Sequence, residues 1–302
     1  MTPVTEALLR ANPLPRHGEA ADKDSRGRVL VVGGSVEVPG GALLAAVGAL
    51  RAGAGKLQVA TCRSIAPHLG LAVPEALVAG LAETALGGIH PDAAEGLIER
   101  SKRVDALLVG PGMMDPDATR ALTARILAET TCPGIVLDAG ALDGLEHQAE
   151  ALRRHAGRVV LTPHAGEMAH LLGIPRDVVE AGPLVAARKA AALLHCVVVM
   201  KGGETGIVTP QGEAWHFTGG TVGLATSGSG DTLAGVIAGL LARGAVPLWA
   251  AIWGVYLHGT AGNVLMARHG GIGFLARELL AEVPSVMAGL QQEGSGGPGR
   301  LG

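Results

Sequence analysis

One stretch of the sequence combines an acid, a hydroxyl and two glycines directly before a long apolar segment. It is Gly228-Ser229-Gly230-Asp231, and the helix predicted behind it spans Thr232–Ala242. Glycines let a backbone approach a phosphate closely, and the N–H groups at a helix N-terminus attract anions. Because Asp231 would repel a phosphate, its place here indicates a base that removes a proton from an attacking hydroxyl. On these residues alone, a simple helix cap at Ser229 or Asp231 is an equally good interpretation.

Two other polar groups follow short apolar runs. Lys201-Gly202-Gly203 comes after Val197–Met200, and His164 comes shortly after Val159–Leu161. Lys201 could attract the phosphates of a nucleotide or pair with a carboxylate of the core. His164 could contact a ligand or be a loop histidine satisfied by the backbone. Glu167 lies on the same face of the helix that begins there, where the helix dipole also favours an acid.

Short β-branched runs alternate with helical runs rich in Ala and Leu along most of the chain. This alternation predicts an α/β fold with a mostly parallel sheet covered on both faces. The predicted strands are Arg28–Val32, Lys56–Ala60, Ala106–Val109, Ile135–Asp138, Val159–Leu161 and Val197–Met200, followed by a hairpin of Thr205–Thr209 and Glu213–Phe217. From about residue 229 the pattern becomes helical, with helices predicted at Thr232–Ala242, Leu248–Ala267 and Phe274–Leu290.

Five of the predicted strands end in loops that are rich in glycine or polar residues. The loops are Gly33-Gly34-Ser35, Gly110-Pro111-Gly112, Asp138-Ala139-Gly140, Thr162-Pro163-His164 and Lys201-Gly202-Gly203. Ligands of open parallel sheets bind beyond the carboxyl ends of the strands. One such loop can be a compact turn and no more, but five together predict one broad cleft.

Composition excludes several classes of protein. Hydrophobic residues make up 48% of the 302 residues, so the chain can bury a large core. A net charge of −3 and an aromatic content of 2% argue against nucleic-acid binding. Cys62, Cys132 and Cys196 are far apart and are interpreted as buried reduced thiols. The apolar stretch Thr232–Leu257 contains Arg243, so it is predicted to form two buried helices and not a membrane span.

We predict one catalytic domain. It spans residues 26–290, after an N-terminal lead-in at 1–25 and before a flexible tail at 291–302. The first residues lack the apolar core of a secretion signal, so a cytoplasmic location is expected.

Several short motifs resemble those of the NAD(P)H-hydrate dehydratases, a family of the ribokinase-like superfamily. Residues 163–167 match the family form PHxGE, Lys201–Thr205 matches KGxxT, and 223–235 is similar to the family's anion-loop signature. Leu257-His258-Gly259 matches LHG, and Gly27–Ser35 is similar as well. The resemblance covers roughly residues 20–290 and implies a ribokinase-like three-layer α/β/α sandwich.

The resemblance also implies an activity. Such an enzyme uses ADP or ATP to dehydrate the S-epimer of hydrated NADH or NADPH, through phosphorylation of the hydroxyl and loss of phosphate. It implies Asp231 as the catalytic base and an anion hole made by Gly228, Ser229 and Gly230. It further implies two binding sets: Lys201, Gly202, Gly203, Glu204, Thr205 and Gly230 for the nucleotide, and Gly41, Gly112, His164 and Asp231 for the hydrate.

Five positions depart from the family pattern. The family usually has Tyr at Val38, Ala at Gly41, Gly at Met114, Asp at Gly140 and Asn at Gly220. Most of them lie around the implied hydrate pocket, so they affect substrate detail more than nucleotide use.

Two alternatives remain at this point. One is a ribokinase-like kinase that acts on an alcohol precursor of a vitamin, although PHxGE before KGxxT favours the dehydratase. The other is a non-catalytic nucleotide sensor, which the departures at Met114 and Gly140 support. A hydride-transferring Rossmann enzyme is disfavoured, because no G-x-G-x-x-G follows Gly33 and Arg51–Gly55 lacks the expected acid.

Cofactor and partners follow from the chemistry and the resemblance. Phosphoryl transfer implies Mg²⁺ with the nucleotide, although the sequence shows no dedicated metal cluster. The resemblance implies a separate epimerase that interconverts the two hydrates, because the dehydratase region fills this chain. It also implies a homo-oligomer, a tetramer by resemblance.

Overall fold

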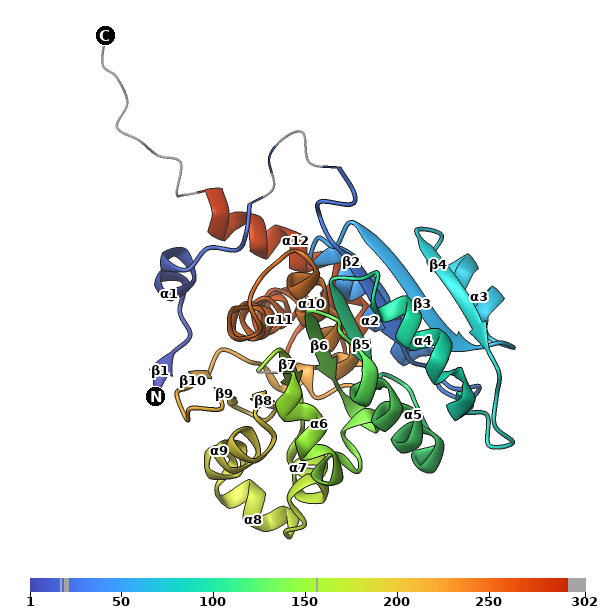
Figure 1. Cartoon of the computed structure of the whole chain (residues 1–302). Coiled ribbons are helices and arrows are strands. Elements are labelled where there is room, and N and C mark those ends of the chain that lie inside the picture. Colours follow the sequence, from blue (N-terminus) through green and yellow to red (C-terminus); the bar gives the residue numbers. More distant parts are fainter. Residues whose placement is uncertain (17, 19–21, 156, 293–302) are drawn as a thin grey trace.

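The sheet runs through the whole molecule, from the amino-terminal segment to the far edge near β4 (Figure 1). The computed structural model describes residues 1–16, 18, 22–155 and 157–292. Within them the ten strands lie in the order β1-β10-β9-β8-β7-β6-β5-β2-β3-β4. Their bounds are β1 Thr2–Pro3, β2 Arg28–Val32, β3 Lys56–Cys62, β4 Ala76–Leu81, β5 Ala106–Val109, β6 Gly134–Leu137, β7 Val159–Leu161, β8 Val197–Met200, β9 Thr205–Val208 and β10 Ala214–Phe217.

The predicted parallel sheet and its hairpin are both confirmed. Strands β2 to β8 pair in parallel, whereas β8–β9 and β9–β10 pair antiparallel. The residues of β5, β6, β7 and β8 are all buried, as expected for short apolar strands covered by helices on both faces. Two strands were not predicted: β4 pairs only with β3 at the sheet edge, and β1 adds two residues beside β10.

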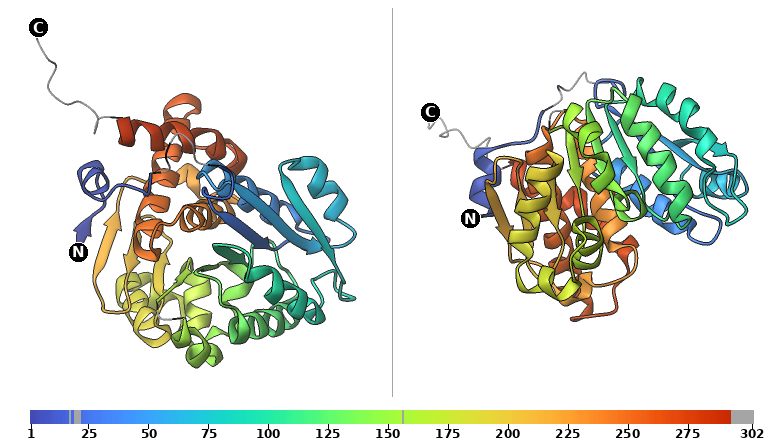
Figure 2. Two further views of the ribbon diagram at one scale, coloured as in Figure 1. Left: turned by 45° about the horizontal axis from the view of Figure 1, so that its top comes forward. Right: turned by 60° about the horizontal axis from the view of Figure 1, so that its bottom comes forward.

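Helices cover both faces of the sheet and form the outer layers (Figures 1 and 2). On one face α2, α10, α11 and α12 pack against one another, and α4 to α9 cover the other. The bounds are α1 Glu6–Ala11, α2 Pro39–Arg51, α3 Ala66–Ala72, α4 Ala94–Ser101, α5 Pro116–Glu129, α6 Ala149–Arg154, α7 Ala165–Leu172, α8 Arg176–Ala181, α9 Pro183–Leu194, α10 Ser229–Ala242, α11 Pro247–His269 and α12 Ala276–Gln292. The three predicted C-terminal helices are therefore confirmed, with ends that differ by at most three residues.

Helices α2 and α10 touch along small residues. A Cβ atom at Gly235 would lie 2.1 Å from the carbonyl oxygen of Ala45, and one at Gly239 would lie 2.3 Å from that of Ala49. Both pairs have the same offset in the sequence, so the two helices run side by side in the same direction.

Adding a methyl group to this contact is expected to destabilise the protein. Gly235→Ala should lower the free energy of unfolding by about 1–3 kcal/mol, because backbone atoms of α2 must move. Gly40→Ala is the matched control, since its Cβ would meet nothing within 4 Å and alanine favours a helix. Urea denaturation checks both, and equal stabilities for the two variants would contradict the tight contact.

The remaining expectations concern the two ends of the chain and the membrane. Helix α1 and strand β1 lie in the predicted lead-in, and β1 is bonded to β10 through the N–H of Val4, which donates to His216 O at 2.8 Å. Residues 293–302 of the predicted tail lie outside the described residues. None of the helices in the described ranges is long and apolar enough to cross a membrane.

Candidate functional site

The loop before α10 places a row of backbone amides at one end of the helix. Gly228 precedes the helix with a left-handed φ of +85°, a conformation that favours glycine. Its carbonyl oxygen accepts from the amide and the hydroxyl of Thr232, both at 3.0 Å. Helix geometry leaves the first amides of α10 without acceptors inside the helix. The Ser229 amide donates to the carbonyl oxygen of Thr226 at 3.2 Å. A helix end of this kind attracts anions, so the anion hole at Gly228-Ser229-Gly230 stays a prediction.

Lys201, at the end of β8, reaches this loop from the opposite side. Its Nζ lies 3.1 Å from the place where a side chain on Gly230 would begin. The ammonium is 2.9 Å from Oδ1 of Asp138 and 3.6 Å from Oε2 of Glu167. Burial alone lowers the pKa of Lys201, but the two carboxylates raise it by more, so the pKa lies above its ordinary value and the side chain is charged.

Asp138 is a residue of the site to which sequence reasoning gave no role. It follows β6, is 1% exposed, and accepts a 2.7 Å hydrogen bond from the hydroxyl of Thr162. The alternative in which Lys201 pairs with a carboxylate of the core is thus correct in this structure. The available signal was the position of Asp138 at a strand end two strands away from Lys201, which parallel pairing brings to the same edge of the sheet.

His164 and Glu167 together begin helix α7. Nδ1 of His164 accepts from the amides of Gly166 and Glu167 at 3.0 and 3.3 Å, and the His164 amide donates to Oε2 of Glu167 at 2.7 Å. This is a capping box, with histidine in place of the usual serine or threonine. In the neutral ring the proton then sits on Nε2, which lies 3.4 Å from Oε1 of Glu167. The backbone-satisfied interpretation of His164 therefore holds for Nδ1.

The proline–histidine turn, Pro163-His164, is hydrogen-bonded to the lysine loop, Lys201-Gly202-Gly203. The amide of Lys201 donates to the carbonyl oxygen of Pro163 at 2.8 Å. Glu167 contacts both the lysine ammonium and Nε2 of His164, at 3.6 and 3.4 Å. The lysine loop and the proline–histidine turn thus share one charged cluster, and Asp231 of α10 interacts with the charges of Lys201 and Glu167 in it.

Asp231 has an unusual charge environment. Burial raises its pKa from the ordinary 3.8 to about 6, and the negative charges of Asp138 and Glu167 act in the same direction, against the pull of Lys201. A carboxyl with this pKa can accept a proton near neutral pH and release it again, as a general base must.

A cavity of about 690 Å³ opens beside these groups. Pockets that bind small molecules measure roughly 300–1,000 Å³. Its lining includes His164, Lys201, Gly202, Gly203, Thr205, Ser229 and Gly230. Phe217, Leu224 and Val255 add an apolar wall. Of the predicted nucleotide-binding residues, only Glu204 is absent from this lining, and it is exposed.

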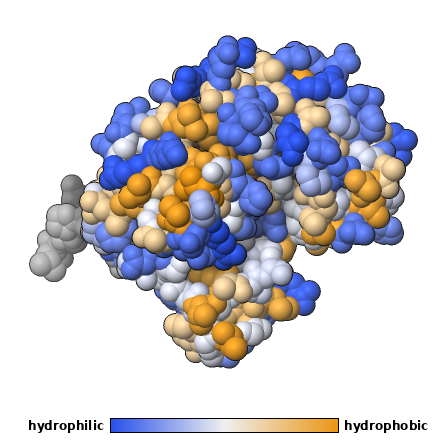
Figure 3. Space-filling view, turned by 90° about the horizontal axis from the view of Figure 1, so that it is seen from below, coloured by the Kyte–Doolittle hydropathy of each residue, from blue (hydrophilic) through white to orange (hydrophobic). Residues whose placement is uncertain are grey.

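One face of the molecule is visibly hollowed. Figure 3 shows a recess between the main body and a smaller lower lobe, on which hydrophobic residues gather. The right-hand view of Figure 2 places the orange segments of the chain at this lower edge. Between residues 222 and 275 of the chain, the large hydrophobic side chains that are exposed are those of Val222, Val246, Met266, Ile272 and Leu275.

The other predicted binding residues form a second group. Gly41 and Gly112 are in contact, since a Cβ at Gly41 would lie 2.6 Å from the amide nitrogen of Gly112. The glycine loops after β2 and β5 also meet, through a 2.7 Å bond from the Gly34 amide to Pro111 O. Neither Gly41 nor Gly112 lines the large cavity. Asp231, the residue after Gly230 in α10, is likewise absent from that lining.

Two departures from the family pattern follow from close contacts in the backbone. The approach of Gly112 explains why position 41 carries no side chain here. A Cβ at Gly140 would lie 2.7 Å from Met113 O, so Asp would not fit there without movement. Val38 and Met114 are exposed, at 37% and 55%, and Gly220 lines the cavity.

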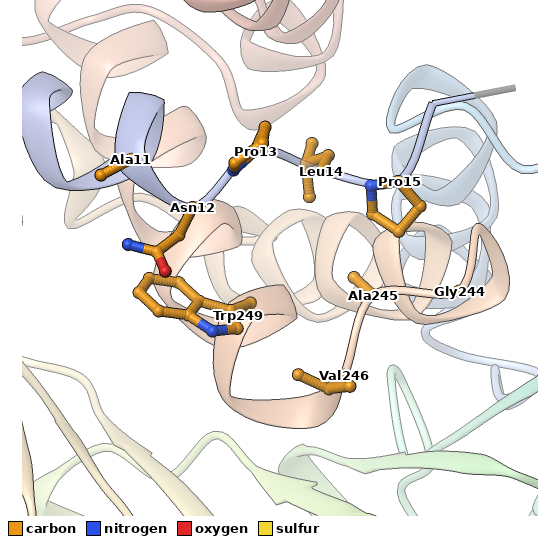
Figure 4. A pocket seen from close by; sticks show the side chains of 9 residues that line it. All are labelled: Ala11, Asn12, Pro13, Leu14, Pro15, Gly244, Ala245, Val246 and Trp249. Carbon is orange, nitrogen blue, oxygen red and sulfur yellow. The ribbon is translucent and has the colours of Figure 1, made fainter.

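A smaller cavity of about 330 Å³ lies elsewhere (Figure 4). It is formed by the segment after α1 and the turn between α10 and α11, with Trp249 at one side. Its lining has no acid, base or nucleophile and includes none of the predicted site residues. The chemistry therefore belongs to the large cavity.

Comparison with known proteins agrees with this geometry. A family model described as NAD(P)H-hydrate dehydratase matches residues 29–285. The ADP-dependent (S)-NAD(P)H-hydrate dehydratase of Xanthomonas campestris is 50% identical over 94% of this chain and 95% of its own length. A bifunctional NAD(P)H-hydrate repair enzyme of Moorella thermoacetica is 39% identical over 96% of this chain, which spans 54% of that protein.

A solved structure resembles this chain in both fold and sequence. It is the ADP/ATP-dependent NAD(P)H-hydrate dehydratase of Bacillus subtilis, co-crystallised with ATP and Mg²⁺. It superposes with a TM-score of 0.79 at 30% identity, over 96% of this chain and 98% of its own. Since a family model and a relative of equal length agree with the converging site, the chain belongs to the NAD(P)H-hydrate dehydratases of the ribokinase-like superfamily.

Proposed function

We propose that this chain uses ADP or ATP to dehydrate the S-epimer of NAD(P)H hydrate and so restores NADH or NADPH. The observation that carries the proposal is the convergence of Asp231, Lys201 and His164 at one anion-binding helix end. The 50% identical relative of equal length, named for ADP and the S-hydrate, supports this substrate choice. The match to the dehydratase family model argues against the vitamin-precursor kinase as the main activity.

The chemistry explains why a dehydratase has the fold of a kinase. Hydroxide is a poor leaving group from carbon, whereas a phosphate ester leaves readily. Asp231 would take the proton of the hydrate hydroxyl while the oxygen of that hydroxyl attacks the terminal phosphoryl group of the nucleotide. AMP would leave when ADP is the donor. The C–O bond then breaks with release of phosphate. A neighbouring carbon loses a proton, which restores the double bond of the ring.

The positions of the other residues suit this reaction. The nucleotide would lie in the large cavity, with its base against the apolar wall and its phosphates at the start of α10. The charged Lys201 and the amides of Gly228–Gly230 would stabilise negative charge on the transferring phosphoryl group. Gly41, Gly112 and His164 would hold the hydrate with its hydroxyl near Asp231, His164 from the lining of the large cavity and the two glycines from outside it.

Mg²⁺ would enter with the nucleotide as part of this substrate. In the described ranges no three His, Cys, Asp or Glu side chains are placed to hold a metal ion. Mg²⁺ bound to nucleotides is commonly held by the phosphates and only one or two carboxylates, so a dedicated cage is not required. We propose two partners besides the substrates: a separate epimerase that supplies the S-hydrate, and further copies of this chain in a homo-oligomer, a tetramer by resemblance.

The direct test is a recovery assay. The purified chain is incubated with acid-made NADH hydrate, Mg²⁺ and either ADP or ATP, while absorbance at the reduced-nicotinamide band is followed. We expect recovery of the band only with nucleotide, together with release of AMP when ADP is present. No recovery with either nucleotide would contradict the proposed function, and accumulation of a stable phosphorylated product would favour a kinase.

The activity should fall at acid pH with the protonation of Asp231. Since the pKa of this carboxyl is about 6, kcat/KM should decline below that pH. Asp138→Asn removes a negative charge that raises the pKa of Asp231, so the decline should move to lower pH. The pH profile of kcat/KM for both proteins checks this, and Asp117→Asn on the surface is the control. An unchanged or alkaline-shifted profile for Asp138→Asn would contradict the coupling.

A further inference from the structure

A buried histidine beneath the anion loop has no role in the mechanism described above. His258 lies in α11, within the Leu257-His258-Gly259 motif, and is 9% exposed. Its Nε2 lies 3.0 Å from the Oγ of Ser229, the first residue of α10. Both residues line the large cavity. The contact therefore joins the middle of one long helix to the anion-binding end of another.

His258 is neutral under ordinary conditions. Burial lowers its pKa to about 4, and the positive charge of Lys201 acts in the same direction. A neutral imidazole has one ring nitrogen that donates and one that accepts. The Ser229 contact consequently has a direction: Nε2 either donates to the serine oxygen or accepts the serine hydrogen.

An anion at the start of α10 makes one of these directions favourable. If Ser229 donated its hydrogen to His258, the lone pairs of the serine oxygen would face the phosphate. If His258 donates, the serine oxygen is satisfied from behind and its own hydrogen is free to point at the phosphate. Among the described residues His258 is the one hydrogen-bond partner found for this hydroxyl.

We propose that His258 is a positioning residue whose Nε2–H donates to Ser229 Oγ and thereby turns the Ser229 hydroxyl hydrogen toward the phosphoryl group in transfer. The proposal rests on the proposed binding of nucleotide phosphates at Gly228–Gly230. It gives Ser229 a side-chain function in addition to its backbone amide. It also explains why a histidine lies in an otherwise apolar stretch of α11.

A double-mutant cycle tests the proposal. Ser229→Ala and His258→Leu should each lower kcat with ADP by about ten- to a hundredfold, the range expected for loss of a hydrogen bond to a charged group. The double variant should be no slower than the slower single variant, because the histidine acts through the serine. His258→Gln, which offers an amide donor, should recover part of the loss. Losses that multiply in the double variant would overturn the proposal.

The matched control removes another buried histidine. His155 is 3% exposed, and its Nε2 is bonded to Leu127 O at 2.9 Å, outside the cavity lining. His155→Leu should lower stability yet leave kcat of the folded protein unchanged. A loss of kcat equal to that of His258→Leu would show that any buried histidine has this effect, and it would overturn the proposal.

A spectroscopic measurement needs no activity. With ¹⁵N-labelled histidine and ADP bound, the Nε2 signal that disappears in His258→Gln should have the chemical shift of a nitrogen that carries hydrogen. A hydrogen-free Nε2 would overturn the proposal even if the variants folded poorly. Turnover of the wild-type chain in the same recovery assay tests the proposed function separately, so failure of one can be told from failure of the other.

Discussion

Asp231→Asn is expected to fold and to bind nucleotide but to turn over the hydrate about 10²- to 10⁴-fold more slowly, the range over which a general base contributes. The amide keeps the size of the side chain but cannot take the hydroxyl proton. Single-turnover recovery of the reduced-nicotinamide band measures the loss, and calorimetric titration with ADP measures binding. Unchanged turnover would refute the role of Asp231 as the base, and it would revive the non-catalytic sensor or a different base.

The same substitution should make the protein more stable at neutral pH. Because the pKa of Asp231 is raised from 3.8 to about 6 on folding, the native protein favours the protonated form. Wild-type stability therefore falls as pH rises between these values and stays lower above them. Asparagine cannot ionise, so the variant should be more stable than wild type by about 2–3 kcal/mol at pH 8, with no difference below pH about 3.5. Urea denaturation of both proteins at pH 8 and at pH about 3.5 checks whether the variant is the more stable protein at the higher pH alone.

Asp117→Asn provides the control for both effects. This carboxylate lies in the first turn of α5, and its side chain is 93% exposed. Its replacement should change neither turnover nor the pH dependence of stability by a measurable amount. A gain in stability of equal size for Asp117→Asn would mean that general charge repulsion, and not burial of Asp231, causes the effect.

Lys201→Met is expected to damage both stability and activity. It leaves the buried carboxylate of Asp138 with Thr162 as its remaining neutral partner, and breaking such a buried pair costs about 3–5 kcal/mol. It also removes the positive charge beside Gly230, which should weaken nucleotide binding and slow phosphoryl transfer. Urea denaturation, together with KM for ADP and kcat, measures the separate losses.

The double variant Lys201→Met with Asp138→Asn separates the two roles of the lysine. Removing both charges should restore most of the stability, because no uncompensated charge stays buried and the introduced amide oxygen can still accept from the hydroxyl of Thr162. Activity should remain low, because the cation near the phosphates is still missing. If activity returned with stability, Lys201 would be a structural partner of Asp138 and no more.

These two sets of variants address one electrostatic arrangement. Three carboxylates, those of Asp138, Glu167 and Asp231, surround one ammonium. Asp138 and Glu167 hold the lysine charged and in place. Burial, together with their negative charge, raises the pKa of Asp231 to about 6, which suits a base that works near neutrality. Binding of the nucleotide and removal of the proton therefore depend on the same few side chains.

The sequence alone determined the fold class and the identity of the motifs. Buried parallel strands are read from continuous β-branched runs, so β2, β5, β7 and β8 were predicted to the residue. The edge strands β1 and β4 were not, because edge strands are short and are defined by their neighbours more than by their own residues. The order of the PHxGE, KGxxT and GSGD motifs was sufficient to indicate the family.

Only the tertiary structure decided which side chains meet. Asp138 lies 63 residues from Lys201, and Ser229 lies 29 residues from His258, so no local pattern reveals either pair. The close contact of Gly41 with Gly112 joins α2 to the loop after β5, and the contacts of Gly235 and Gly239 join α10 to α2. Local propensity and hydrophobic periodicity determine elements, whereas the charge state of a buried acid depends on neighbours that packing alone supplies.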